Sequence, residues 1–107
     1  MSFSSAYREG KTLYNARLEV ANLEWEIDQK TSRLTALKSE IISATAAQID
    51  GTLTAQERIE LASRVQRLYE EREQLKLAIP VLEDRLAEKS RDLDRLSQTV
   101  ASATPQR

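Results

Sequence analysis

Residues 48–54 read Gln-Ile-Asp-Gly-Thr-Leu-Thr, and this segment decides the fold of the 107-residue chain. The Asp50-Gly51 pair favours a reversal of the chain, because glycine can adopt a positive φ at no steric cost. Thr54 is followed three residues later by Glu57, the spacing of a capping box that bonds two free backbone N–H groups at a helix start. The segment therefore predicts a turn over residues 49–53 and a helix that begins at Thr54.

The sequence before the turn carries apolar residues at the 3.5-residue spacing of a coiled coil. One heptad position is wholly apolar and holds Ala6, Leu13, Val20, Ile27, Leu34 and Ile41. The position three residues later is apolar except at Glu9 and Lys30, and holds Glu9, Ala16, Leu23, Lys30, Leu37 and Ala44. Residues 3–48 are therefore predicted to form one long helix with a single apolar seam.

The sequence after the turn repeats this pattern. One heptad position holds Leu61, Leu68, Leu75, Leu82, Lys89 and Leu96, and the other holds Val65, Arg72, Ile79, Leu86, Leu93 and Val100. Each half has ten apolar residues at twelve seam positions, whereas a chain with 40% apolar residues would fill about five by chance. Residues 54–101 are therefore predicted to form a second long helix.

The two apolar ladders meet if the chain folds back at Gly51, so that Leu37 faces Val65 and the neighbouring layers follow in phase. The turn and the phase of the ladders are independent observations, and their agreement favours pairing within one molecule. We therefore expect an all-α protein, a long antiparallel two-helix coiled-coil hairpin over residues 1–101, followed by a disordered tail over residues 102–107. A dimer of two straight chains whose arms do not fold back is the alternative topology.

Polar residues interrupt the seam, and a proline interrupts the second helix. Lys30 faces Arg72, so two cations share one layer. Their aliphatic stems can lie along the seam while their charged groups reach glutamates at the surface. Alternatively, the layer fixes the alignment of the helices at some cost in stability, or contacts an anionic group of a partner. Near Pro80 we expect a kink, as simple curvature or as a hinge, because the ladder keeps its phase on both sides.

Apolar residues also occur away from the seam. Tyr14, Leu18 and Trp25 share the outer face of the first predicted helix, and Leu77 and Val81 share that of the second. In the hairpin register Leu77 is level with Trp25. Contiguous exposed apolar surface usually marks an interface, so we expect these residues to bind protein. The partner is either a second hairpin, giving a four-helix bundle or a higher oligomer, or another helical protein.

The composition excludes several kinds of chemistry. The chain has no His and no Cys, which removes the usual general base, the thiol nucleophile and the soft metal ligands. We therefore expect no enzyme activity, no cofactor and no metal site. The 16 basic and 17 acidic residues are interleaved, and their net charge of -1 predicts no nucleic-acid binding. Neither a signal peptide nor a membrane span is predicted, so we expect a cytoplasmic protein that does not bind membranes.

These observations indicate a non-enzymatic coiled-coil protein with a structural, scaffolding or adaptor role, whose main partner is a second copy of itself. The first alternative is a regulator or chaperone-like protein that docks its apolar outer face onto a partner's helix. The second alternative is a nucleic-acid-associated coiled coil, which the mixing of positive and negative charges disfavours.

Overall fold

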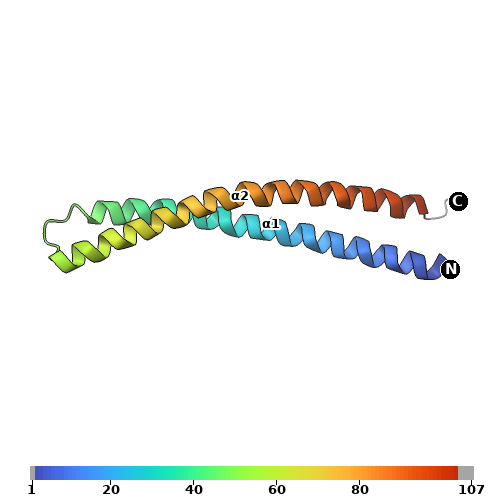
Figure 1. The fold of residues 1–107 in the computed structure, drawn as a ribbon, viewed down its shortest axis with the longest axis horizontal. Coiled ribbons are helices and arrows are strands. Elements are labelled where there is room, and N and C mark those ends of the chain that lie inside the picture. Colours follow the sequence, from blue (N-terminus) through green and yellow to red (C-terminus); the bar gives the residue numbers. More distant parts are fainter. Residues whose placement is uncertain (1, 104–107) are drawn as a thin grey trace. The chain divides into compact units, whose positions relative to one another are not determined.

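The structure is a computed structural model that describes the backbone of residues 2–103 and the side chains of residues 11–102. Two long helices, α1 (Ser2–Ala47) and α2 (Ala55–Ala103), make up nearly all of the described chain (Figure 1). The helices pack against each other as a helical hairpin, and residues 2–103 contain no strand. The all-α fold class and the hairpin are therefore confirmed. Assembly into a four-helix bundle or a higher oligomer stays a prediction.

The helix ends lie close to the predicted ones. Helix α1 ends at Ala47, one residue before the predicted boundary, and α2 begins one residue after Thr54. At its other end α2 continues to Ala103, so two residues assigned to the disordered tail are helical. Ser102 and Ala103 are both compatible with helical backbone, so the helix can continue through them. Residues 104–107 of the predicted tail lie outside the described residues.

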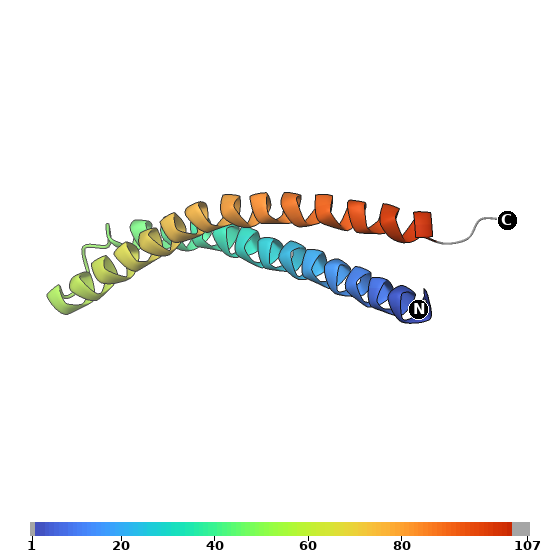
Figure 2. The ribbon, with the colours of Figure 1, turned by 45° about the vertical axis from the view of Figure 1, so that its right-hand side comes forward.

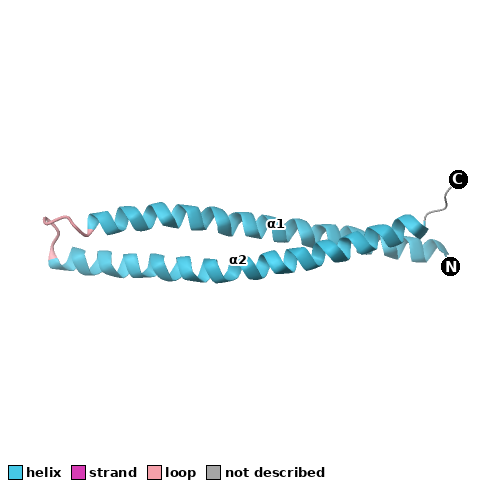
Figure 3. Ribbon diagram, turned by 90° about the horizontal axis from the view of Figure 1, so that it is seen from above, coloured by secondary structure: helices cyan, strands magenta, loops and turns pink. Residues whose placement is uncertain are grey.

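The loop between the helices, pink in Figure 3, is organised by Asp50. Three backbone bonds of 3.2 Å, from residues 48, 49 and 50 to carbonyls three residues earlier, tighten the end of α1. One oxygen of the Asp50 carboxylate then accepts bonds from the Thr52 backbone N–H (2.9 Å) and hydroxyl (2.7 Å). These two bonds hold the pKa of the Asp50 carboxyl below its usual value. The side chain of Asp50 thus replaces part of the backbone bonding that the chain loses at the reversal.

Gly51 does not use the conformation that the sequence suggested for it. Its φ is not positive, and a Cβ added to it would meet no atom within 4 Å. The expectation of a left-handed glycine was therefore wrong. The residues between Ala47 and Ala55 are numerous enough to reverse the chain with ordinary backbone angles, once Asp50 bonds Thr52.

The capping box is confirmed at the start of α2. The Thr54 backbone N–H donates to a carboxylate oxygen of Glu57, and the Glu57 backbone N–H donates to the Thr54 hydroxyl, both at 3.1 Å. The first backbone bond of the helix runs from the Arg58 N–H to the Thr54 carbonyl at 3.0 Å. Thr54 is therefore the residue that starts and caps α2.

The chain forms two compact units. The turn unit comprises residues 28–80, and the terminal unit comprises residues 1–27 and 81–107. In the turn unit, Leu37 is fully buried in a cluster whose members all come from the two predicted ladders: Leu37, Ile41, Ala44 and Leu68, with Leu61, Val65 and Leu75 packed against them. The ladders therefore meet within one molecule, as predicted.

The terminal unit has buried seam residues of its own. Here the beginning of α1 and the end of α2 lie alongside each other (Figure 2). Its buried residues are Val20 and Leu23 from α1 and Leu82 from α2, all at predicted seam positions. Helix α2 runs through Pro80 without ending. The kink at Pro80 stays a prediction.

Candidate functional site

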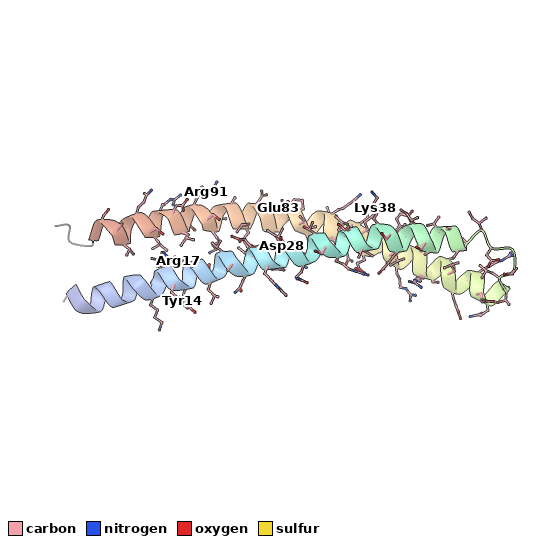
Figure 4. All side chains as sticks on the ribbon, turned by 180° about the vertical axis from the view of Figure 1, so that it is seen from behind. Tyr14, Arg17, Asp28, Lys38, Glu83 and Arg91 are labelled. Atoms are coloured by element: carbon pink, nitrogen blue, oxygen red, sulfur yellow. The ribbon has the colours of Figure 1, made fainter. Side chains whose placement is uncertain are left out.

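Three of the residues predicted to bind protein form an exposed stripe on α1 within the terminal unit. We call Tyr14, Leu18 and Trp25 the tryptophan stripe. All three are exposed, and Tyr14 and Trp25 each expose 65% of their surface. Their spacings of four and seven residues place them on one face of the helix, over about 16 Å. Figure 4 shows Tyr14 on the side of α1 away from α2. The stripe is therefore available to another molecule.

The two predicted contact residues of α2 are also exposed. Val81 belongs to the terminal unit, as does the tryptophan stripe, and exposes 56% of its surface. Leu77 belongs to the turn unit and exposes 74%. Both therefore present apolar surface to solvent. The alignment of Leu77 with Trp25 stays a prediction.

The predicted polar layer, Lys30 with Arg72, lies within the turn unit, and both residues are half-buried. The guanidinium carbon of Arg72 lies 4.7 Å from the centre of the Tyr69 ring, a cation–π distance. One terminal nitrogen is 3.4 Å from a carboxylate oxygen of Glu73, a long contact, and the buried Nε has no hydrogen-bond partner. Arg72 therefore lies partly in the seam, packed on Tyr69, with one buried N–H that no hydrogen bond satisfies. Its role in aligning the helices stays a prediction.

One flank of the seam in the turn unit is closed by ion pairs that the sequence analysis missed. Arg33 on α1 donates two bonds to the carboxylate of Glu71 on α2, from Nε at 2.6 Å and from Nη2 at 3.0 Å. A third bond, from Nη1 to Glu40, is 3.0 Å long. The hydrogen bonds from Arg33 hold the pKa of Glu71 below its usual value, and those to Glu71 and Glu40 raise the pKa of Arg33. We call Arg33, Glu40 and Glu71 the closed flank.

The other flank of the same seam is an open groove of about 610 Å³ between α1 and α2. Its apolar surface comes from Leu34, Ile41 and Ile42 of α1 and from Tyr69 of α2. Three cations line it as well, Lys38 of α1 with Arg72 and Lys76 of α2, and no acidic residue does. Lys38 projects from the surface of the hairpin (Figure 4). We call this surface the cationic groove.

The heptad pattern contains a signal for both flanks. Arg33, Glu40 and Glu71 occupy the position just before a seam residue, whereas Lys38, Tyr69 and Lys76 occupy the position just after one. In antiparallel helices each of these positions faces its own kind across the seam, and charges there pair between helices. The heptad positions thus indicate which residues share a flank, but they do not indicate which of these residues pair.

A lysine at a seam position of the terminal unit is also paired. Lys89 of α2 places its ammonium nitrogen 3.3 Å from a carboxylate oxygen of Glu19 on α1. The stem lies at the seam while the charge leaves it, which is how a cation is tolerated in a coiled coil.

Over the described part of the chain, no group of three or more acidic side chains is placed to hold a metal ion. Within the same residues, neither helix has a stretch apolar and long enough to cross a bilayer. Compared with known protein families, curated proteins and solved structures, the chain matches none significantly.

Proposed function

We propose that this protein is a non-enzymatic structural element, a scaffold or an adaptor, that self-associates through the tryptophan stripe together with Leu77 and Val81. The observation that supports this most directly is the exposure of Trp25 in line with two other large side chains on α1. Tryptophan and tyrosine are the residues most often responsible for binding energy at protein interfaces. The residue chemistry of the chain also points to binding, because it has no histidine or cysteine.

The free energy gained by covering the tryptophan stripe is large enough to support association through so small a surface. Covering about 150 Å² of indole surface at about 25 cal/mol per Å² contributes roughly 3–4 kcal/mol per tryptophan, before the entropic cost of association. A symmetric dimer covers the stripe of both copies. Two hairpins that pack in this way form a four-helix arrangement, which is a common way for helical hairpins to complete their cores.

The test is the mass in solution of the wild type and of Trp25→Ser. Sedimentation equilibrium at micromolar concentration should give a dimer or a higher oligomer for the wild type. The dissociation constant of Trp25→Ser should be larger by at least about 30-fold, the effect of losing one interface hot spot, because a symmetric dimer loses the tryptophan of both copies. The emission of Trp25, the single tryptophan, should shift to shorter wavelength as the wild type associates.

Ile59→Ser is a matched control. Ile59 is 62% exposed, close to the exposure of Trp25, but it lies on α2 in the turn unit. It should leave the mass unchanged. A wild-type chain that stays monomeric at high micromolar concentration, with solvent-exposed emission, would refute self-association. In that case a helix of another protein becomes the better candidate for the stripe.

A further inference from the structure

The cationic groove is the second surface of the molecule with the properties of a binding site. It extends along α1 from Leu34 to Ile42, a rise of eight residue steps, and along α2 from Tyr69 to Lys76, a rise of seven. At 1.5 Å per residue these spans are about 12 Å and 10.5 Å. A helix that lies in such a groove places about two turns of its apolar face there. The groove is open along one side, so a helix would cover it better than a small ligand.

The charges of the groove select an acidic helix. Lys38 forms no ion pair with any other described residue. Arg72 and Lys76 share one carboxylate, that of Glu73, at 3.4 Å and 3.8 Å. The groove therefore keeps a positive charge that carboxylates from outside can neutralise.

The chain itself contains a helix of the required kind. From Glu19 to Asp28 it carries four acidic residues and no basic residue. Within this stretch Glu24 is exposed beside Trp25 and forms no ion pair with another described residue. Leu18 and Trp25 are seven residues apart, about 10.5 Å along the helix, which matches the length of the groove. The other end of the stripe is cationic, because Lys11 and Arg17 lie near Tyr14.

We propose that the cationic groove of one copy binds the acidic half of the tryptophan stripe, Leu18 to Trp25 with Glu24, of a second copy. This inference rests on the proposed self-association and names the surface that receives the stripe. Leu18 and Trp25 lie on Leu34, Ile41 and Ile42, while Glu24 faces the cations at the rim. The contact joins two different surfaces, so each copy has one of each to offer.

Charge reversal tests the pairing in the full-length chain. Lys38→Glu with Lys76→Glu should weaken association at least about tenfold, because like charges then face each other across the contact. Glu24→Lys should weaken it similarly. An equimolar mixture of the two variants should associate with nearly the wild-type affinity. In the mixed dimer, the unchanged groove of the Glu24→Lys chain meets the unchanged stripe of the other chain. The second contact pairs Glu at positions 38 and 76 with Lys at position 24, so its charges are exchanged but still opposite. The wild-type association should also weaken as salt is added.

Arg58→Glu with Arg67→Glu is the matched control, since it changes the net charge equally at two exposed cations outside the groove. It should leave the affinity unchanged, and far-ultraviolet circular dichroism of each variant reports its folding. If Trp25→Ser dissociates the oligomer while the groove reversals and the mixture behave as wild type, the stripe packs elsewhere. The groove assignment is then wrong and self-association stands. A monomeric wild type overturns both.

Discussion

The two flanks of the seam in the turn unit have the same heptad spacing but differ in how their charged residues are paired. On the closed flank, the guanidinium of Arg33 donates three hydrogen bonds to the carboxylates of Glu71 and Glu40, so its charge is neutralised within the chain. On the cationic groove, Lys38, Arg72 and Lys76 line an apolar surface with no acidic residue among the lining side chains. The closed flank is complete within one chain, whereas in the proposed assembly a second copy completes the groove.

This difference shows how little the heptad repeat by itself says about binding. Both flanks lie over the same buried residues. An exposed ion pair contributes little to the stability of a fold in water. The ion pairs on the closed flank therefore change the free energy of unfolding of the hairpin only slightly. Leaving the other flank unpaired is equally tolerable for the fold, and in the proposed assembly its positive charge selects the partner.

Leu37→Ala removes the support beneath both flanks and has the largest expected effect. Leu37 is the fully buried side chain of the cluster. Its truncation should lower the free energy of unfolding by about 2–5 kcal/mol, through lost apolar contact and the cavity left behind. Urea titration followed by circular dichroism measures this. The control is Ile42→Ala, a residue of the groove that is 61% exposed, which should cost well under half as much. Equal losses for the two variants would mean that Leu37 is not the centre of the seam.

Thr54→Ala tests the capping box at the start of α2. This end of the hairpin sets which residues face each other across the two flanks. The Thr54 hydroxyl accepts the Glu57 backbone N–H, and the variant leaves that donor without its partner. The expected loss is about 1 kcal/mol in the free energy of unfolding. Ser63→Ala, an exposed substitution in the interior of α2, should change the stability by less than half of that. If the two substitutions cost the same, the capping box does not stabilise the start of α2.

Glu71→Gln opens the closed flank and should have the smallest effect. The side chains of Arg33 and Glu71 are 41% and 40% exposed, so solvent screens their attraction, and the loss should be smaller than that from Thr54→Ala. The pKa of Glu71 is lower in the folded chain than in the unfolded chain. Its ion pair therefore stabilises the fold above the unfolded pKa, and this contribution disappears as the pH falls through the folded pKa.

The melting temperatures of the wild type and Glu71→Gln should accordingly differ at neutral pH and low salt, and converge in acid and in high salt. Glu70→Gln is the neighbouring control, because Glu70 is exposed and forms no ion pair with another described residue. A difference for Glu71→Gln that persists in acid would assign the effect to packing of the side chain, and would remove the distinction drawn between the flanks.

Much of the fold was predictable because it depends on short-range rules. The heptad ladders predicted both helices, and the phase of the ladders about the turn predicted that Leu37 and Leu68 enter one cluster. Thr54 and Glu57 predicted their own reciprocal hydrogen bonds, since a capping box involves only four consecutive residues. The exposure of Trp25 followed from its position on the helix face opposite the seam.

The wrong prediction for Gly51 and the missed ion pair of Arg33 have a common cause. The positive φ expected of Gly51 was wrong because Asp50 bonds Thr52 and supplies another way to reverse the chain. The ion pair between Arg33 and Glu71 joins residues that are 38 positions apart, and it depends on side-chain reach as well as on register. Both outcomes depend on which of several available partners a polar group takes.

The sequence by itself determined that this chain forms two apolar-seamed helices, where the first ends and the second begins, and which large apolar residues lie off the seam. These features follow from periodicity and local hydrogen bonding, which neighbouring residues settle among themselves. Only the tertiary structure decided that Arg33 closes one flank while Lys38, Arg72 and Lys76 leave the other open. A long, flexible, charged side chain can meet carboxylates on its own helix or on the facing one, and only the packed helices determine which it meets.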